Sequence, residues 1–234
     1  MNTPRVLPRD AVRDEPLDWP VVGHELLGGG LVSDFVRDTV ETPAGSTMRR
    51  DYLLHPGAVG IIALDADERV VVVRQYRQPV GFRLVEPPAG LLDADDASWV
   101  GAAQRELAEE VELAAADWRV LVDQFNSPGC CQESLRIYLA RDLTPVQRPG
   151  GFTVEDEEAD MDVCLVALDD LVDAVLAGAV QNPTLVAGVL ATHVALRSGR
   201  LDALRPADAP WPARDVKASR DAQIRAHGGQ TRPR

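Results

Sequence analysis

The chain has 234 residues, of which 45% are hydrophobic and 26% are charged, and its formal net charge is -13. This composition predicts a soluble globular protein with one main domain and an accessory piece, and the acidity argues against nucleic acid as a partner, because phosphate binders carry basic patches. The chain has no long apolar run, no signal-like N-terminus and no C-x-x-C pair among its three cysteines, so we expect a cytoplasmic protein that neither crosses nor binds a membrane.

The N-terminal part of the chain is expected to fold apart from the rest. Residues 1–16 are rich in proline and charge, which predicts a disordered arm. Residues 17–56 are predicted to form a β subdomain, because Leu31–Val40 and Met48–Leu54 favour strands and a turn sequence joins them as an antiparallel hairpin. Arg50 lies on the return strand, where it is either a surface charge or a contact for a phosphate group.

Residues 57–204 are predicted to form the main domain. It starts with two apolar runs, Ala58–Leu64 and Val70–Val73, whose β-branched residues and intervening polar turn favour a buried hairpin. Arg77 follows at the strand end, where it serves either as an ion-pair partner or as a bidentate contact for phosphate. A stiff loop then leaves the carbonyl of Ala89 available as a neutral metal ligand.

The segment from Ser98 to Leu113 has the periodicity of an amphipathic helix. Its apolar residues recur at steps of three and four, so they form one stripe that faces a core. Beside the stripe, Glu106, Glu109 and Glu110 crowd into a single turn, where a like-charge pair costs roughly 0.2–0.5 kcal/mol. A solvated acidic face is the simpler interpretation. The alternative is a site for Mg²⁺ or Mn²⁺, which prefer carboxylate oxygens and take further ligands from water and phosphate.

The rest of the main domain is predicted to alternate strands and helices. The predicted elements are strands at Trp118–Phe125 and Leu135–Ala140, a helix from Asp169 or Asp170 to Gly178, and a helix from Asn182 to about Arg197. The loop at 126–133 is long enough to line a pocket. Residues 205–234 lack periodicity and are expected to be a disordered tail.

The order Gly90, then Arg105-Glu106-Leu107-x-Glu109-Glu110, resembles the box of the Nudix hydrolases. The general box reads Gly, five residues, Glu, seven residues, Arg-Glu-apolar-x-Glu-Glu-x-Gly-apolar. Counted back from Arg105, its early Glu falls on Ala97, with one extra residue after Gly90, and its second Gly is replaced by Glu112. A left-handed backbone would cost a non-Gly residue about 1–2 kcal/mol there.

The resemblance implies an α+β protein, an α/β/α sandwich in which a mixed β-sheet lies between helices, with the N-terminal antiparallel β-hairpin as an extension. Pro128 lies fifteen residues past the last box position, Leu113. A proline at about this distance is characteristic of the ADP-ribose pyrophosphatase-like members, which the chain resembles in this respect. Their activity would be hydrolysis of the diphosphate bond of ADP-ribose to AMP and ribose 5-phosphate. The alternatives are a Nudix pyrophosphatase for a sugar nucleotide or dinucleotide, and a catalytically silent sensor module.

The resemblance also implies roles for particular residues. Mg²⁺, with Mn²⁺ as a substitute, would be held by Glu106, Glu110 and the Ala89 carbonyl with help from Glu109, and Arg105 would orient the glutamates. Glu158, with Glu157 and Glu155 as reserves, would take a proton from the attacking water. The residues expected to contact substrate are Arg50, Arg77, Glu86, Pro128 and Glu133. Similar enzymes are homodimers whose N-terminal strands exchange and help bind adenine and ribose, so a homodimer is expected.

Overall fold

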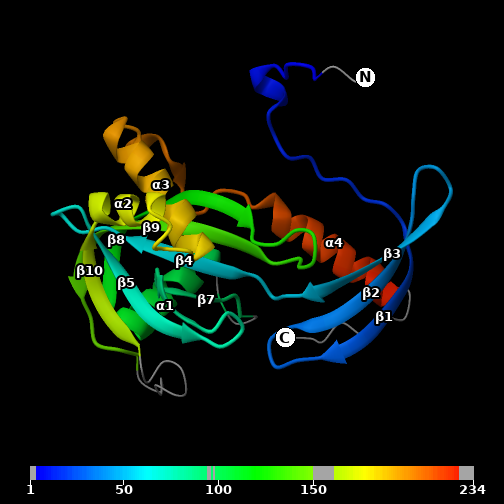
Figure 1. The fold of residues 1–234 in the computed structure, drawn as a ribbon, viewed down its shortest axis with the longest axis horizontal. Helices are drawn as coiled ribbons and strands as arrows, with labels where there is room; N and C mark the ends of the chain where they lie inside the picture. The colour runs from blue at the N-terminus through cyan, green and yellow to red at the C-terminus, as the bar shows by residue number, and fades with distance from the viewer. Residues whose placement is uncertain (1–3, 94–95, 97, 150–160, 227–234) are drawn as a thin grey trace.

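The structure is a computed structural model that describes residues 4–93, 96, 98–149 and 161–226. Its strands form three sheets, with orders β1-β2-β3, β10-β5-β6 and β11-β8-β9-β4-β7 (Figure 1). The elements in chain order are η1 (Arg9–Ala11), β1 (Val21–Gly29), β2 (Asp34–Glu41), β3 (Thr47–Leu54), β4 (Ala58–Ala63), β5 (Arg69–Arg77), β6 (Phe82–Glu86), β7 (Ala89–Leu91), α1 (Trp99–Val111), β8 (Leu113–Phe125), β9 (Ser134–Pro145), β10 (Asp162–Ala167), α2 (Leu168–Leu176), α3 (Pro183–Arg197), η3 (Leu201–Ala203), β11 (Arg205–Pro206) and α4 (Pro212–Ala226).

The main domain is the expected α/β/α sandwich with a mixed sheet. Strand β4 runs parallel to β9 and antiparallel to β7. Because side chains alternate along a strand, Val59 and Ile61 of β4 pack on the side of α1, whereas Ile62 packs on the opposite side with residues of α2 and α3. Both faces of β4 are therefore buried, which explains why its sequence is almost wholly apolar.

The predicted hairpin between the first two apolar runs was wrong. Strands β4 and β5 belong to different sheets, and only an isolated bridge from Leu64 to Val70 joins their ends. The reason is that β7 and β9 already pair with the two edges of β4, while β6 and β10 pair with those of β5. The short polar turn between the runs leads the chain from one sheet into the other.

The N-terminal sheet contains the expected hairpin, in which β2 pairs with β3 in regular antiparallel register. Strand β1 adds a third strand on the other edge of β2. Residues 4–18 precede this sheet and are all exposed, and they extend away from the rest of the molecule in Figure 1. No helix within the described residues is long and apolar enough to span a bilayer.

The expectation of a disordered tail was wrong for residues 205–226, which form β11 and α4; residues 227–234 lie outside the described part. Strand β11 pairs with β8, and α4 lies beside β1 of the N-terminal sheet (Figure 1). Trp211 and Ile224 are almost completely buried. Two large apolar side chains thirteen positions apart are enough to fix this segment, although they produce no visible periodicity.

Candidate active site

Helix α1 carries the acidic residues of the candidate site. Ser98 is its N-cap, and the Ser98 hydroxyl accepts a hydrogen bond from the Gly101 amide at 3.0 Å. Ala103 and Leu107 are buried against the sheet, as the apolar stripe predicts. The helix ends at Val111, and the C-cap residue Glu112 has a left-handed backbone with φ of 56° and ψ of 40°. The chain therefore turns where the box has its second Gly, but it does so with a residue that has a Cβ atom and is strained there.

Arg105 is the centre of the polar cluster on this helix. Its Nη1 atom donates hydrogen bonds to Glu106 Oε1 at 2.7 Å and to Glu109 Oε2 at 3.0 Å. Burial alone would lower the pKa of Arg105, but the hydrogen bond to Asp96 and the charge of Glu106 outweigh burial and raise it. Arg105 is therefore a permanent cation that binds two of the helix carboxylates through one nitrogen atom.

The loop before the helix brings two further acids to Arg105. The Asp96 carboxylate accepts from Nε at 3.1 Å and from Nη2 at 3.3 Å, while Asp93 Oδ2 lies 3.5 Å from Nη2. The Leu91 carbonyl also accepts from Nη2, at 3.4 Å. Acidic side chains thus surround this guanidinium in excess of its single positive charge.

The Glu106 side chain is largely buried, with 13% of it exposed. Burial raises the pKa of its carboxyl to about 7, although the charge and hydrogen bond of Arg105 act in the opposite direction. The carboxylate packs onto Gly90 of β7 so closely that any side chain at position 90 would overlap it. The Gly of the sequence motif is therefore explained by contact with the motif's first helical glutamate.

Glu110 lies against the same strand. Its Oε2 atom accepts a hydrogen bond from the Ala89 amide at 3.0 Å, so two of the predicted metal ligands are neighbours. Among the described residues, no three Asp, Glu, His or Cys side chains converge closely enough to hold an ion by themselves. The donors nevertheless fit a hard divalent cation, because they are carboxylate and carbonyl oxygens on a protein surface with an excess of negative charge.

The predicted substrate residues Arg77 and Glu86 contact each other. Arg77 Nη2 lies 2.7 Å from Glu86 Oε2, and Arg77 Nε lies 3.2 Å from both carboxylate oxygens. Glu86 is buried, whereas Arg77 is partly exposed. The pair joins the ends of β5 and β6, next to the strand that carries Ala89 and Gly90.

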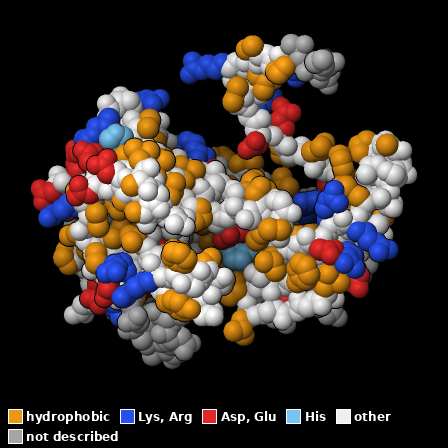
Figure 2. Space-filling model, in the orientation of Figure 1, with side chains coloured by type: hydrophobic (Ala, Val, Ile, Leu, Met, Phe, Trp, Pro, Cys, Tyr) orange, Lys and Arg blue, Asp and Glu red, His pale blue; other side chains and the backbone are white. Residues whose placement is uncertain are grey.

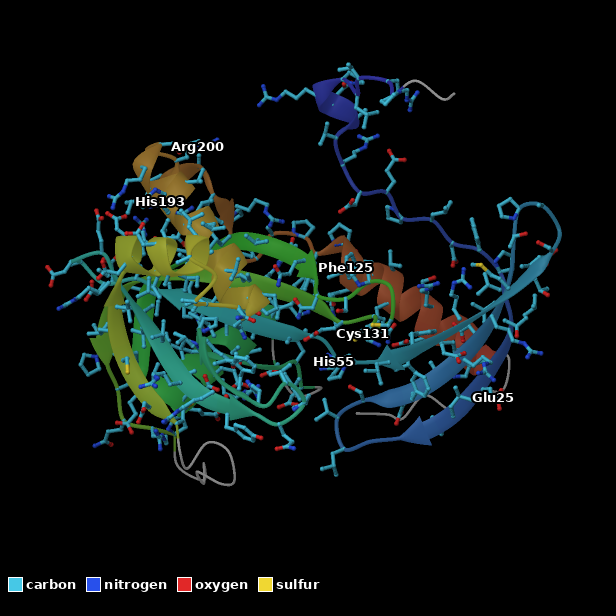
Figure 3. The ribbon with its side chains drawn as sticks, in the orientation of Figure 1. Glu25, His55, Phe125, Cys131, His193 and Arg200 are labelled. Carbon is cyan, nitrogen blue, oxygen red and sulfur yellow. The ribbon has the colours of Figure 1, made fainter. Side chains whose placement is uncertain are left out.

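Glu133 lies where the N-terminal sheet meets the main domain. Its carboxylate accepts from the Asn126 side-chain amide at 2.8 Å and lies 3.8 Å from His55 Nδ1. The neighbouring loop is attached to β3 by hydrogen bonds from the Leu53 amide to the Cys130 carbonyl and from the Gln132 amide to the Leu53 carbonyl. Figure 3 shows His55 and Cys131 close together at this junction.

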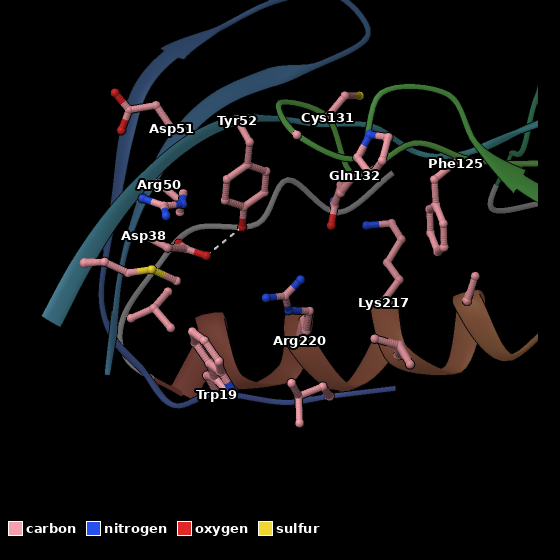
Figure 4. A pocket seen from close by; sticks show the side chains of 17 residues that line it. Trp19, Asp38, Arg50, Asp51, Tyr52, Phe125, Cys131, Gln132, Lys217 and Arg220 are labelled. Carbon is pink, nitrogen blue, oxygen red and sulfur yellow. Dashed lines mark hydrogen bonds between the residues drawn. The ribbon is translucent and has the colours of Figure 1, made fainter. Parts of the chain in front are cut away.

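A cavity of about 560 Å³ opens between the N-terminal sheet, this loop and α4 (Figure 4). Arg50 and Pro128, two predicted substrate contacts, line it. So do residues that sequence reasoning missed: Trp19, Tyr52, Phe125, Lys217 and Arg220. The last two belong to α4, a segment that was predicted to be disordered because its sequence lacks visible periodicity.

The acids that line the cavity already have partners. Arg37 donates two hydrogen bonds of 2.7 Å to Asp51. Asp38 lies 2.7 Å from His24 Nδ1 and accepts a hydrogen bond from the Tyr52 hydroxyl, also at 2.7 Å. Burial first, and then this hydrogen bond, raises the pKa of Tyr52, so the phenol stays neutral. Arg50 and Arg220 consequently give the cavity a cationic character in an otherwise acidic protein.

The predicted base Glu158 and its reserves Glu157 and Glu155 lie outside the described residues. For the remaining predicted residues, the structure forms two groups. The first joins the acids of α1 with Ala89 of β7, and the Arg77–Glu86 pair lies on β5 and β6 of another sheet. The second places Arg50 and Pro128 in the cavity, with Glu133 in the loop beside it.

Comparison with known protein families gives one match. The model of the NUDIX domain matches residues 54–187, more than half of the chain. The chain belongs to the Nudix family. The matched range includes α1 and its carboxylates, as well as Arg77, Glu86 and Glu133. It excludes most of the N-terminal sheet and all of α4.

Proteins that are similar to this chain differ in how much of it they match. An ADP-ribose pyrophosphatase of Mycobacterium tuberculosis is 40% identical over 194 residues, which cover 83% of this chain and 91% of that protein. A methanol dehydrogenase activator of Bacillus methanolicus is 34% identical over 146 residues, covering 62% and 77%. The crystal structure of an ADP compounds hydrolase matches with a TM-score of 0.64 and 21% identity, covering 81% of this chain and 100% of that one. This last likeness shows the Nudix fold.

Proposed function

We propose that this Nudix hydrolase cleaves the diphosphate bond of ADP-ribose. Water adds to one phosphorus, the bond to the bridging oxygen breaks, and AMP and ribose 5-phosphate leave with the protons released. The observation that carries the proposal is the excess of carboxylates around Arg105 on the Nudix helix. It is supported by 40% identity to an ADP-ribose pyrophosphatase over nearly the whole length of that protein.

The proposed cofactor is Mg²⁺, which Mn²⁺ can replace. Glu106, Glu110 and the Ala89 carbonyl would hold the cation, with Glu109 beside them. When bound, the ion would neutralise charge on the diphosphate oxygens and favour deprotonation of the attacking water. Arg105 keeps Glu106 and Glu109 together through one nitrogen atom, which limits the rotamers that these carboxylates can adopt before the cation arrives.

The proposed general base is Glu158, with Glu157 or Glu155 as alternatives. A base is required because water is a weak nucleophile at neutral pH unless a proton is removed as it attacks. A carboxylate that is free of the metal would serve this role. The assignment rests on the resemblance of the stretch at 157–161 to related enzymes.

Arg77 is proposed to bind a substrate phosphate while Glu86 holds its guanidinium in place. Glu86 is buried, and a buried carboxylate without its cationic partner is unfavourable. The pair is therefore expected to stay together, which keeps the Arg77 guanidinium in place at the end of β5. A guanidinium suits this role because it carries five N–H groups in one plane, a geometry that matches phosphate oxygens.

The cavity beside α4 is proposed to take the nucleoside end of the substrate. Its volume lies within the range of roughly 300–1,000 Å³ that is common for small-molecule sites. Trp19, Tyr52 and Phe125 offer aromatic faces for a base, and Arg50 and Arg220 offer positive charge (Figure 4). Pro128 and Glu133 would shape this end of the site through the loop that carries them.

A homodimer is proposed on the basis of the outward face of the N-terminal sheet. Phe35 and Leu53 are cross-strand partners there, and both are exposed. Val22 of β1 is also exposed, and Figure 2 shows hydrophobic side chains among the charged ones over this part of the surface. Size-exclusion chromatography with light scattering tests the proposal. The wild type should have twice the chain mass of 25.3 kDa, and Phe35→Asp with Leu53→Asp should yield the monomer.

The activity is tested by comparing kcat/KM for ADP-ribose, GDP-mannose and NADH at the same Mg²⁺ concentration, with products separated by chromatography. ADP-ribose should be the best substrate and should yield AMP and ribose 5-phosphate in equal amounts. A higher value for GDP-mannose or NADH would assign another nucleoside diphosphate derivative. Absence of product from all three would indicate a catalytically silent sensor.

The cytoplasmic location is a proposal that fractionation of the source cells would check.

A further inference from the structure

Helix α4 supplies one wall of the cavity. Among its described residues, those that line the cavity follow the spacing i, i+3, i+4 and i+7, which is that of one helix face. They are Ala213, Val216, Lys217 and Arg220. The start of the helix is fixed, because Trp211 is buried with its ring centroid 5.3 Å from that of Trp99, and Arg214 Nη1 donates to the Pro56 carbonyl at 2.5 Å. The NUDIX match ends at residue 187, so this wall lies outside the matched domain.

The charged groups of the cavity differ in whether the protein balances them. The Asp38 side chain has its two hydrogen-bond partners and is only 3% exposed. Lys217 Nζ donates to Asp221 Oδ2 at 2.9 Å. Among the described residues, no carboxylate lies within ion-pair distance of Arg50 or Arg220, and Arg50 Nη1 donates to the carbonyl of the preceding residue. Two arginines of the cavity thus retain their positive charge in an acidic protein.

The two arginines reach the cavity from different elements. Arg220 extends from α4 toward the N-terminal sheet (Figure 4). Burial raises the pKa of Tyr52, whereas the charge of Arg220 acts to lower it, so this guanidinium lies near the phenol. Arg50 lies on β3 two residues before Tyr52 and is the cross-strand partner of Asp38. Because residues two apart share a face of a strand, Arg50 and Tyr52 face the cavity together.

A neutral nucleoside gives these two charges no anion to bind, since the diphosphate is assigned to the acids of α1. A phosphate monoester carries about 1.5 to 2 negative charges at pH 7, which two guanidinium groups balance, and its oxygens match the planar arrangement of their N–H groups. We propose that the cavity binds an adenosine whose ribose carries a further phosphate, and that Arg50 and Arg220 hold that phosphate. This rests on the proposed function and narrows the substrate to ADP-ribose phosphorylated on its adenosine ribose.

Binding in the absence of metal tests the proposal. Isothermal titration calorimetry gives the Kd of 5′-AMP, adenosine 2′,5′-bisphosphate and adenosine 3′,5′-bisphosphate. The wild type should bind at least one bisphosphate about 10-fold more tightly than 5′-AMP, which is the order of effect of one charge-assisted hydrogen bond. The isomer that binds more tightly identifies the phosphorylated hydroxyl group. Arg220→Met and Arg50→Met should each remove most of this preference and retain binding of 5′-AMP.

Lys217→Met is the matched control, because Lys217 lines the cavity from the same helix but is paired with Asp221. Its preference for the bisphosphate should equal that of the wild type. Each preference compares ligands within one variant, so 5′-AMP reports whether the cavity is intact, and the wild-type measurement depends on no variant at all.

Three results would overturn the proposal. The first is equal affinity of the wild type for all three ligands. The second is an equal loss of preference in Lys217→Met, which would assign the effect to the general positive potential of the cavity. The third is a loss of 5′-AMP affinity in the arginine variants as large as the loss of bisphosphate affinity, because the arginines would then stack on the base.

Turnover separates this proposal from the proposed function. With Mg²⁺, kcat/KM for ADP-ribose that carries the preferred phosphate should exceed kcat/KM for ADP-ribose about 10-fold, the factor expected for binding. If neither compound is hydrolysed, the proposed function fails and the binding preference stands. A preference in binding without one in turnover would contradict the assignment of the phosphorylated compound as substrate.

Discussion

Arg136 and Arg105 each lie at the centre of a polar cluster, and the two clusters differ in how the charge of the guanidinium is balanced. The Arg136 side chain is completely buried and packs against the rings of Trp99 and Trp211, whose centroids lie 5.5 and 4.7 Å from its guanidinium carbon. Its nitrogens bind one carboxylate, Asp123, at 2.6 and 3.0 Å, together with the carbonyls of Ala209 and Pro210. Arg205 also binds Asp123, at 2.6 Å.

Around Arg105 the balance is reversed, because one cation meets four carboxylates. In the Arg136 cluster every guanidinium nitrogen of Arg136 has an acceptor within the protein, and two arginines share one carboxylate, so no acid is in excess. The Arg105 cluster retains negative charge that a second cation would neutralise. A packed arginine is thus structural where its own protein matches its charge, and it marks a binding site where the surrounding acids exceed it.

The largest effect is expected from Arg136→Met, which breaks the matched cluster. It leaves two carbonyls without their donor and takes one of two cationic partners from Asp123, and disrupting a buried pair costs about 3–5 kcal/mol. We expect the free energy of unfolding in urea to fall by about 3 kcal/mol. Arg141→Met is the control, because Arg141 also pairs with an aspartate of β8, Asp117, but is partly exposed; that variant should lose less than about 1 kcal/mol.

The same cluster predicts a pH dependence. Burial would raise the pKa of Asp123, but the hydrogen bonds from Arg136 and Arg205 outweigh burial and hold the pKa below its usual value. The stability that this ionised carboxylate contributes is present above the pKa of the unfolded chain, about 3.9, and is lost as pH falls through the lower folded value. The difference between wild type and Arg136→Met should therefore shrink below about pH 4. A constant difference would mean that the tryptophan contacts carry the effect.

The next largest effect is expected from Glu106→Gln, which removes charge from the unbalanced cluster. Stabilisation of transition-state charge by a metal is worth several kcal/mol, so kcat should fall about 100-fold, and Mn²⁺ affinity should fall with it. Stability without metal should not decrease, because the variant removes a buried negative charge that other acids repel. Glu112→Gln, at an exposed side chain on the same helix, should retain activity. A loss of stability in Glu106→Gln would place Glu106 with the structural residues instead.

The two clusters also show what could be predicted from the sequence. Helix α1 and its glutamates were predictable, because the apolar period and the motif are local. The pairing of β4 with β7 and β9 was not, since β-sheet partners depend on distant segments. The burial of Trp211 against Arg136 was not predictable either, because it involves residues more than seventy positions apart. Asp96 was missed for another reason, which is that counting the box back from Arg105 places its early acid on Ala97, whereas counting forward from Gly90 places it on Asp96.

A smaller effect is expected from Gly90→Ala, which disturbs the unbalanced cluster without changing its charge. The added methyl group would overlap the Glu106 carboxylate, so this side chain must rotate and leave the position that Arg105 gives it. Mn²⁺ affinity and kcat should each fall about 10-fold, in the range known for displaced metal ligands. Gly28→Ala is the matched control, since a methyl group there meets no atom within 4 Å. Equal losses in the two variants would contradict the contact.

The smallest effect is expected from Glu112→Gly at the end of the same helix. The backbone of Glu112 is left-handed, which is unfavourable by about 1–2 kcal/mol for a residue with a Cβ atom. Glycine removes this strain but also the exposed ion pair with Arg148, at 3.4 Å. The free energy of unfolding should therefore rise by about 1 kcal/mol, with kcat unchanged.

Glu112→Ala decides which property of Glu112 limits stability. Alanine removes the negative charge of Glu112 but keeps the Cβ atom. The free energy of unfolding should therefore hardly change if backbone strain is the cause. An equal gain from alanine and glycine would instead assign the effect to repulsion among the acids of α1. The excess negative charge around Arg105 would then extend to the end of the helix, beyond the residues that contact the guanidinium.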